Sequence, residues 1–273
     1  MKTLYQALEA YPGIGAAVAG HLNESGIHDW ADLTRVNLAD YRDDLTKRVA
    51  PSTAKTYMAV LGAAITRYED AVEIPCKDYR KYIKVKGDKP VKIFLTKEEL
   101  ERLERVYTET PIEKFVQLSF LVEAYTGMRV SDCMEVSKEN IMNGFLTYTS
   151  IKTKIQATVP CCKRVVEYIE QLRKYDFRPC ITTYETTIRK LCQRAGLTER
   201  VKIHKAGKDE VRPKWECVTS HTARVSAATN LAIAGVPLCD IKQILGHTSE
   251  VMSSRYIAQH EVKLNERAMA YFR

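Results

Sequence analysis

Apolar residues recur at the spacing of a helix face through most of the chain. In residues 51–74 they follow an i, i+3, i+4 pattern, at Tyr57, Val60, Leu61, Ala64, Ile65 and Tyr68. This pattern places them on one side of an α-helix, which Ser52 or Thr53 is expected to cap just after Pro51. A second helix is expected over residues 37–49. A largely apolar helix from Pro111 to Tyr125 is expected to be central to the core.

The second part of the chain mixes helical spacing with one stretch of strand spacing. Residues 144–161 alternate and are rich in β-branched side chains on both sides of a basic turn, which predicts a strand, a turn and a second strand. Thr96 and Glu99 form a capping-box pattern at the start of a new helix. Further helices are expected over 161–174, over 183–195 and beyond 220, with a surface loop or hairpin over 197–220. The fold class is therefore mostly α, with a small antiparallel β-sheet.

Residues 87–92 separate two domains. Gly87 and Pro90 interrupt the helical pattern among lysines, as is typical of an exposed linker. A chain of 273 residues is long enough for two compact domains. We therefore expect a first domain at 1–86, a basic linker at 87–92 and a second domain at 93–273.

Composition narrows the class of protein. A content of 45% hydrophobic and 28% charged residues is typical of an ordinary soluble globular protein. It has no apolar run of membrane-spanning length and no signal-peptide pattern, so a cytoplasmic location is expected. The eight cysteines are scattered, and none shows the two-residue spacing of zinc or redox motifs. Free thiols, no metal and no cofactor are therefore expected.

The net charge of +8 favours a polyanionic partner, since Lys and Arg that neutralise phosphates release condensed counterions. The basic residues concentrate around the linker, where two lobes would close around a duplex. The candidate DNA contacts there are Arg80, Lys81, Lys84, Lys86, Lys89 and Lys92.

Residues 11–33 contain a Gly-Ile-Gly turn between short helical patterns. They faintly resemble a helix-hairpin-helix, whose backbone amides contact DNA phosphates. The alternative is a glycine-rich segment that simply turns the chain.

A group of residues suited to phosphate chemistry lies near the C-terminal end. His221 and Arg224 are three residues apart and share a helix face, close to backbone amides that favour an anion. His247 follows the helix end at Gly246, and Tyr256 comes nine residues later. Taken singly, each has an ordinary explanation: a solvated arginine, a helix-capping histidine, a packing tyrosine.

Taken together, "TGMRVSD", "HTAR", "LGH" and "RY" resemble, in order and spacing, the tyrosine recombinase family of phage integrases and Xer-type recombinases. The resemblance covers the second part of the chain nearly end to end and, in the first part, chiefly residues 51–65. The family's catalytic pattern matches Arg129, Lys152, His221, Arg224, His247 and Tyr256.

The resemblance implies a two-domain DNA clamp, with a helical, SAM-like core-binding domain at 1–86 and a catalytic domain at 93–273. It implies that Tyr256 attacks a DNA phosphodiester and forms a 3′-phosphotyrosine intermediate. Such covalent storage of the bond energy makes the reaction independent of metals. Arg129 and Arg224 would clamp the phosphate, because a guanidinium presents fixed bidentate donors.

The remaining roles also follow from the resemblance. Lys152 would protonate the leaving 5′-oxygen, with Lys154 as the alternative. His221 would act as general base or phosphate contact, and His247 would hydrogen-bond the phosphate. Asp132 would orient its neighbours; the plain alternative is a surface ion pair with Arg129. Two departures from the family pattern are mild, namely Met128 in place of Leu and Asp132 in place of Glu.

The implied partner is double-stranded DNA, bound by a homotetramer that joins two sites through a Holliday junction, with a nucleoid-associated location and no membrane. Accessory DNA-bending proteins are left open, as is whether a helix after Tyr256 packs on its own domain or on a neighbouring protomer. The expected role is integration or excision of a mobile element, with Xer-like resolution as the alternative. A non-catalytic DNA-binding protein and a type IB topoisomerase are the alternatives from other classes.

Overall fold

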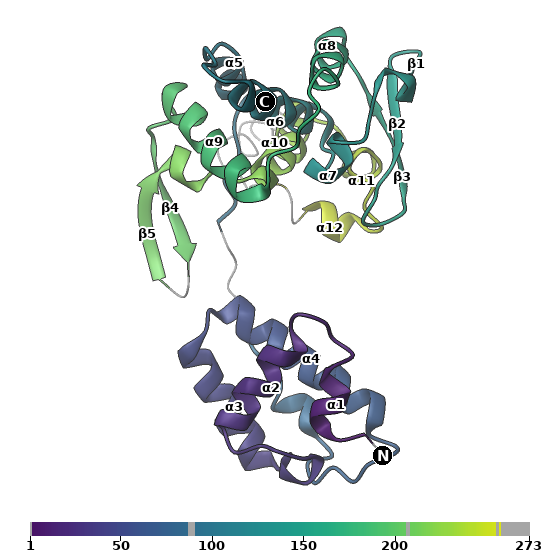
Figure 1. The fold of residues 1–273 in the computed structure, drawn as a ribbon, viewed down its shortest axis with the longest axis vertical. Helices are drawn as coiled ribbons and strands as arrows, with labels where there is room; N and C mark the ends of the chain where they lie inside the picture. The colour runs from purple at the N-terminus through teal and green to yellow at the C-terminus, as the bar shows by residue number, and fades with distance from the viewer. Residues whose placement is uncertain (1, 87–90, 206–207, 255–256, 258–273) are drawn as a thin grey trace, which may run out of the picture. The chain divides into compact units, whose positions relative to one another are not determined.

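The computed structural model describes residues 2–86, 91–205, 208–254 and 257. The chain divides into two compact units (Figure 1). The first comprises Met1–Pro90 with Ile203–Glu210, and the second comprises Val91–Lys202 with Val211–Arg273. No helix among the described residues is both long and apolar enough to cross a membrane.

The first unit is helical. Its elements are α1 (Leu4–Leu8), α2 (Gly15–Glu24), η1 (Trp30–Asp32), α3 (Arg35–Arg48), α4 (Pro51–Tyr68) and η2 (Tyr79–Lys81). The apolar face predicted for α4 is buried at Leu61, Ala64 and Ile65, and this helix packs against α1, α2 and α3. The periodicity therefore identified the central helix of this unit correctly.

The start of α4 differs from the prediction. The helix begins at Pro51 with Ala50 as its N-cap, and no side chain caps it, so the expected Ser52 or Thr53 cap is wrong. Proline at the first helical position lacks only an N–H that would have no partner inside the helix, and its φ is already helical. Proline itself therefore starts the helix, and both hydroxyl residues lie within its first turn.

Residues 11–33 include a tight turn between α1 and α2. Gly13 has a φ of 79°, and a Cβ on Gly15 would lie 1.9 Å from the carbonyl oxygen of Leu8. The end of α1 therefore approaches the start of α2 so closely that only glycine fits there. A tight turn thus joins two helices here, whereas the helix-hairpin-helix and its contact with DNA stay a prediction.

The second unit is built around one apolar helix, as the sequence predicts. Its helices are α5 (Lys97–Glu104), α6 (Pro111–Thr126), α7 (Val130–Cys133), η3 (Lys138–Asn140), α8 (Lys163–Leu172), α9 (Ile181–Arg194), η4 (Lys214–Cys217), α10 (Ser220–Ala234), α11 (Leu238–Leu245) and α12 (Glu250–Ser254). Helix α6 packs against α5, α7, α8, α9 and α10. The capping box of Thr96 and Glu99 is present at the start of α5. The mostly helical fold class is confirmed.

A three-stranded antiparallel sheet lies at one edge of this unit (Figure 1), in the order β1 (Ile141–Met142), β2 (Phe145–Thr149) and β3 (Gln156–Pro160). The predicted strand–turn–strand is β2–β3, while the short β1 was not anticipated. Leu146 and Tyr148 face the core, and Thr147 pairs with Thr158 on the exposed face. The segment expected as a loop or hairpin is the hairpin β4 (Arg200–Lys205) and β5 (Lys208–Pro213).

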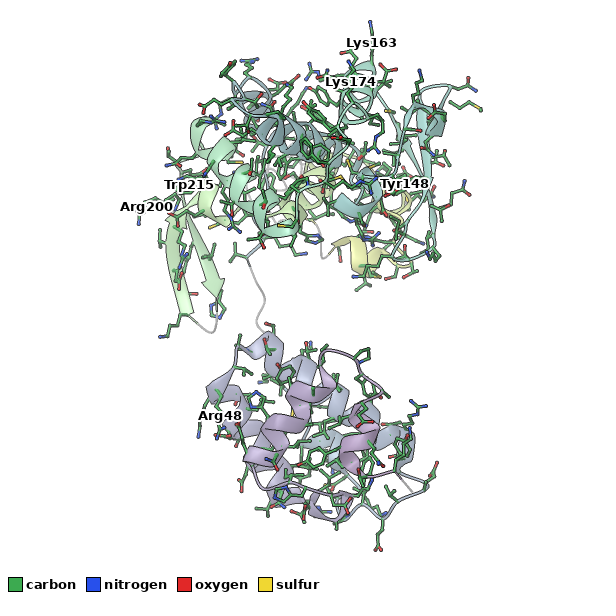
Figure 2. The ribbon with its side chains drawn as sticks, viewed as in Figure 1. Arg48, Tyr148, Lys163, Lys174, Arg200 and Trp215 are labelled. Carbon is green, nitrogen blue, oxygen red and sulfur yellow. The ribbon has the colours of Figure 1, made fainter. Side chains whose placement is uncertain are left out.

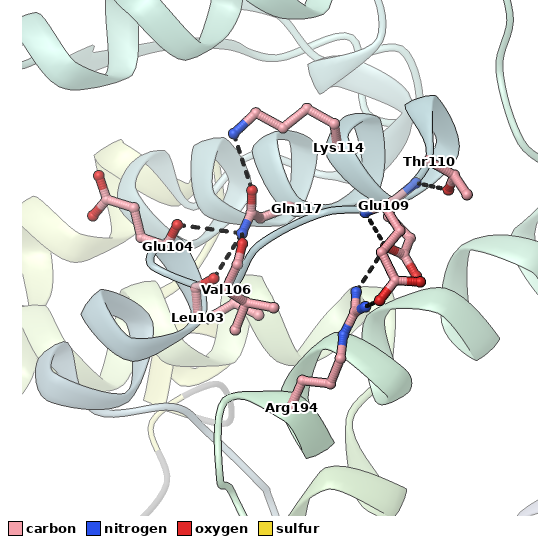
Figure 3. Close-up of polar contacts among 9 residues, drawn as sticks. Leu103, Glu104, Val106, Glu109, Thr110, Lys114, Gln117 and Arg194 are labelled. Atoms are coloured by element: carbon pink, nitrogen blue, oxygen red, sulfur yellow. Dashed lines mark hydrogen bonds and ion pairs between the residues drawn. The ribbon is translucent and has the colours of Figure 1, made fainter.

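A buried amide joins α5 to α6. The Gln117 side chain is 1% exposed, and its Nε2 donates to the carbonyl oxygens of Leu103 at 2.8 Å and Val106 at 2.9 Å (Figure 3). Leu103 lies in the last turn of α5 and Val106 just beyond the helix, where carbonyls lack the usual i+4 partner of a helix. Gln117 therefore fixes the angle at which the chain leaves α5 and enters α6.

The chain that enters the second unit is fastened to α10. Ser226 Oγ accepts from the Leu95 N–H at 2.8 Å, and Asn230 Nδ2 donates to the Leu95 carbonyl at 2.9 Å. Close by, the buried Lys214 ammonium donates to both carboxylate oxygens of Glu99, at 2.8 and 2.7 Å. Residues just after the predicted linker are therefore a fixed part of the second unit.

Candidate active site

Arg224 on α10 is the most deeply buried of the predicted catalytic residues, at 1% exposure. Its Nη1 donates to the carbonyl of Gly127 at 2.5 Å, and its Nη2 donates to that of Leu245 at 2.6 Å. These carbonyls belong to the ends of α6 and α11, where the helix dipole is negative and favours a cation. Two helix ends therefore hold the guanidinium in one orientation.

Gly127 and Gly246 make this arrangement possible. Both have positive φ, 74° and 59°, and they end α6 and α11 in left-handed C-caps. A Cβ on Gly127 would lie 2.6 Å from Leu245 Cδ2, so the two helix ends approach each other through the glycine. The turn that the sequence predicts at Gly127 thus also sets the position of Arg224.

Arg129 lies at the N-cap of α7, directly after this turn. Its Nη1 donates to Ser150 Oγ at 2.9 Å and lies 3.9 Å from Asp132 Oδ2. Asp132 is 2% exposed, and its Oδ1 accepts from the backbone N–H of Ile151 at 2.9 Å. Asp132 is therefore a buried contact between α7 and the β2–β3 turn, not a surface ion pair.

Lys152 lies in that β2–β3 turn and is exposed. The turn is closed by two backbone hydrogen bonds, from Ser150 N to the Ile155 carbonyl at 2.9 Å and from Lys154 N to the Ser150 carbonyl at 2.8 Å. Lys154 has a φ of 56°, so it is the residue at which the turn reverses the chain. Lys152 therefore extends from a short, well-defined turn.

His221, in the first turn of α10, lies close to several cations. Partial burial lowers its pKa first, followed by the positive charges of Arg224, Lys92, Arg129 and Lys152. A histidine surrounded in this way is neutral at physiological pH and can accept a proton. The same interactions indicate that arginines and lysines from four separate segments lie near His221.

His247 is held between Arg224 and α12. It is 5% exposed, its Nε2 lies 2.8 Å from Arg224 Nη2, and its Nδ1 lies 3.0 Å from Ser253 Oγ. A guanidinium only donates, so Nε2 accepts and the ring proton is on Nδ1. Burial, then Arg224, lowers its pKa to about 4. In this arrangement the neutral ring orients Arg224; the expected hydrogen bond to a phosphate stays a prediction.

Residues 93–262 match the Phage integrase family, which is well over half of the chain. The chain belongs to this family. It is also 26% identical over 203 residues to the tyrosine recombinase XerC of Pediococcus pentosaceus, a match that covers 70% of this chain and 65% of that protein. The chain therefore spans less than two thirds of this relative's length.

Solved structures of integrases share the fold. The Tn1549 transposon integrase in complex with a circular intermediate DNA has a TM-score of 0.71 and 14% identity, with 100% of both chains covered. A lambda integrase dimer bound to a COC′ core site has a TM-score of 0.65 and 18% identity, with 93% of this chain and 95% of that chain covered. XerH bound to a palindromic difH substrate has a TM-score of 0.65 and 16% identity, over 95% and 77%.

Some predicted site residues of this integrase-family chain are not placed. Tyr256, the expected nucleophile, and Lys89 lie outside the described residues. In the first unit the exposed Arg80 pairs with Glu69 at 2.9 Å, and Lys81 lies 3.4 Å from Asp78. Lys84 and Lys86 are exposed as well, as a DNA contact requires.

Lys92 was assigned to the linker, but its charge acts on two of the predicted catalytic residues. It precedes the segment fastened to α10, and its charge lowers the pKa of both His221 and His247. The charge of Lys92 therefore acts on the candidate site.

Three further residues of the integrase site were missed by sequence reasoning. Ser150 binds Arg129, and Ser253 binds His247. Tyr148 on β2, labelled in Figure 2, is 6% exposed; burial raises its pKa to about 12, and the charge of Arg224 acts against this rise. The only sequence signal was proximity, since Ser150 and Tyr148 precede Lys152 by two and four residues.

Metal ligands are not grouped at this site. Among the residues that the structure describes, no three His, Cys, Asp or Glu side chains come together as a metal-binding group. The charges that act on His221 are instead those of Arg224, Lys92, Arg129 and Lys152, and such a group of cations suits an anion.

Proposed function

We propose that the chain is a site-specific DNA recombinase that cuts and rejoins DNA through a 3′-phosphotyrosine. The observation that best supports this proposal is the convergence of Arg129, Arg224 and Lys152 on His221, together with the bond from Arg224 to His247. Such a group of fixed donors is suited to the extra negative charge of a phosphoryl-transfer transition state.

The residues divide the reaction among them. Tyr256 Oη attacks the phosphorus, an Oη–P bond forms, and the bond from phosphorus to the 5′-oxygen breaks. Arg129 and Arg224 bind the non-bridging oxygens, and Lys152 gives its proton to the departing 5′-oxygen. His221, neutral because its pKa is lowered, takes the tyrosine proton. Attack of a 5′-hydroxyl on the phosphotyrosine reverses these steps and rejoins the DNA.

The partner is double-stranded DNA. Residues 1–86 act as the core-binding domain, 87–92 as the basic linker and 93–273 as the catalytic domain. The cations Arg80, Lys81, Lys84, Lys86, Lys89 and Lys92 contact the DNA backbone. Four protomers join two sites, and strands are exchanged through a Holliday junction. The lambda integrase structures, one of them a tetramer on a Holliday junction, favour this assembly by similarity of fold.

The biological role we propose is integration or excision of a mobile element. Similarity to the Tn1549 transposon integrase over the full length of both chains favours this role. Similarity to the XerC relative favours the second candidate, Xer-like resolution of chromosomes or plasmids. The two differ in substrate: an integrase joins two different DNA molecules, whereas a resolvase acts on two copies of one site.

A covalent-trapping experiment tests the proposal. Wild type, Tyr256→Phe and the control Tyr107→Phe, whose side chain is 81% exposed, are incubated with fragmented DNA of the source genome. The samples are then denatured, and DNA attached to protein is sequenced. We expect adducts in wild type and Tyr107→Phe only, all at one sequence. Adducts in Tyr256→Phe would assign the nucleophile to another tyrosine. Binding without adducts in any sample would favour a non-catalytic DNA-binding protein.

The same preparations separate a recombinase from a type IB topoisomerase. The recovered site is cloned into a supercoiled plasmid, alone or in two copies, and the products are separated on gels. We expect junctions and recombinant circles from the two-site plasmid. Relaxed circles alone, from both plasmids, would instead identify a topoisomerase.

A further inference from the structure

Two adjacent hydrogen bonds fasten the β2–β3 turn to α7. We propose that Ser150 is a positioning residue that holds the Lys152 turn and Arg129 as one unit, so that both are aligned together. The inference rests on the proposed roles of Arg129 as phosphate clamp and Lys152 as proton donor.

Ser150 uses all of its polar groups for this purpose. It is 2% exposed, its hydroxyl oxygen accepts from Arg129 Nη1 at 2.9 Å, and its backbone N–H and carbonyl close the turn at Ile155 and Lys154. Lys152 is two residues further along the chain. A change in the position of Ser150 is therefore passed directly to the backbone that bears Lys152.

On the α7 side the contact is doubled. Next to the bond between Arg129 and Ser150, Asp132 Oδ1 accepts from the Ile151 N–H at 2.9 Å. Two consecutive residues of the turn are thus bound by two residues that lie one helical turn apart on α7. Contacts at two points fix both the distance and the tilt of the turn.

The chemistry of the hydroxyl suits this task. Ser150 is neutral, so it orients the Arg129 guanidinium without adding negative charge to that of Asp132, whose Oδ2 lies 3.9 Å from Arg129 Nη1. The Arg129 side chain is 18% exposed, which leaves part of it accessible to an anion. Arg129 itself therefore supplies the charge that would bind a phosphate. Its hydrogen bond to Ser150 supplies the alignment with the turn that bears Lys152.

The test separates an effect on Lys152 from an effect on the phosphate clamp. Cleavage is measured on the trapped site and on the same site with sulfur in place of the 5′-bridging oxygen. When the P–S bond breaks, the sulfur leaves with the electron pair. A thiol has a pKa near 8.5, so it departs without a proton donor. A variant that has lost only the placement of Lys152 should therefore recover on the sulfur-bridged DNA.

We expect Ser150→Ala to slow cleavage of ordinary DNA by roughly 10- to 100-fold, the size of effect that a small misplacement of a catalytic group produces. On sulfur-bridged DNA it should cleave nearly as fast as wild type. Lys152→Ala should show the same recovery, and Arg129→Lys should be slow on both. The matched control is Thr147→Ala, which removes a hydroxyl from the exposed face of the same hairpin, where it lies 3.1 Å from Thr158 Oγ1.

Equal losses on both substrates, or a Ser150→Ala rate equal to that of Thr147→Ala, would overturn the inference.

Amide hydrogen exchange gives a readout that needs no DNA: Ile151 N–H should exchange faster in Ser150→Ala than in wild type or Thr147→Ala. Unchanged exchange would also refute the inference. If wild type cleaves no DNA, or if Lys152→Ala does not recover, the proposed function fails in that respect, and amide exchange alone decides whether Ser150 holds the turn.

Discussion

Arg224 shows how backbone carbonyls and one side chain together stabilise a buried charge. Its hydrogen bonds to Gly127 and Leu245 go to carbonyl oxygens, and a third contact goes to the ring of His247. A lysine ammonium is a compact point charge without the planar fork of donors of a guanidinium, so it cannot reach these separate acceptors in the same way.

We therefore expect Arg224→Lys to lower the free energy of unfolding by about 2–4 kcal/mol, because buried carbonyls that lose their donor each cost about 1–3 kcal/mol. Cleavage should fall by at least roughly 100-fold. Urea denaturation and the trapping assay measure the two effects, with the exposed Arg105→Lys as control. Unchanged stability in Arg224→Lys would mean that the carbonyls find other donors.

His247 makes stability depend on pH. Its pKa is lowered to about 4 in the folded protein, against about 6.5 in an unfolded chain. Between these values the unfolded chain binds a proton that the folded protein does not. The contribution of His247 to stability is therefore complete above about pH 6.5 and is lost as the pH falls towards 4.

Substitution by glutamine tests this dependence. Denaturation of wild type and His247→Gln between pH 4 and 7 should show a shallower loss of stability in the variant. The exposed His28→Gln serves as control. Parallel curves for wild type and His247→Gln would show that another group causes the dependence.

At the scale of elements, the ends of α6 and α11 matter more for the site than their lengths. Gly127 ends α6, admits Leu245 into contact and presents its carbonyl to Arg224. Gly127 thus meets three requirements: left-handed backbone, close contact with Leu245 and a carbonyl for Arg224. The first two exclude a side chain.

Gly127→Ala should destabilise the second unit by about 2–3 kcal/mol. About 1–2 kcal/mol of this is the cost of left-handed backbone for a residue with a Cβ, and the remainder comes from the clash with Leu245. Gly144→Ala is the matched control, because Gly144 also has a positive φ, 78°, but nothing lies within 4 Å of its added Cβ. Equal losses in the two variants, measured by urea denaturation, would remove the clash from the explanation.

Local signals predicted most elements of this chain and fewer of its contacts. The periodicity that located α4 and α6, and the capping box at Thr96, depend on neighbours within a few residues. The two-residue strand β1 is too short to show alternation. The interactions of Ser150 and Tyr148 with arginines of other elements depend on tertiary packing, which no spacing along the chain encodes.

The same distinction applies within the candidate site. The resemblance to tyrosine recombinases selected Arg129, Lys152, His221, Arg224 and His247, and the structure gathers these five in one region. The resemblance gave no indication that both ring nitrogens of His247 form hydrogen bonds. Nor did it indicate that the charge of Lys92 acts on two histidines.

At the scale of the whole molecule, the two units have separate apolar cores with no residue in common. One core consists of residues from Leu4 to Tyr79, and the other begins at Leu95. Each core is a condition for independent folding.

We expect fragments 1–86 and 91–273 to fold separately, each with a cooperative thermal transition and the helical content of its unit. Circular dichroism of the purified fragments measures both quantities. DNA binding by 1–86 should weaken steeply with salt, and Lys84→Ala with Lys86→Ala should reduce the slope of log K against log salt by about two. A fragment that stays unfolded alone would show that its core depends on the other unit.

The bonds of Arg224 also bear on the order in which the protein is made. The bond from Arg224 to Gly127 connects residues 97 positions apart in the chain, and the bond from Asn230 to Leu95 spans 135. On the ribosome, Arg129 and Lys152 are translated well before α10, so a nascent chain holds part of the candidate site and lacks the helix that bears His221 and Arg224. Long-range contacts of this kind form slowly. The second unit therefore completes its fold late in synthesis, and an unfinished chain lacks the complete candidate site.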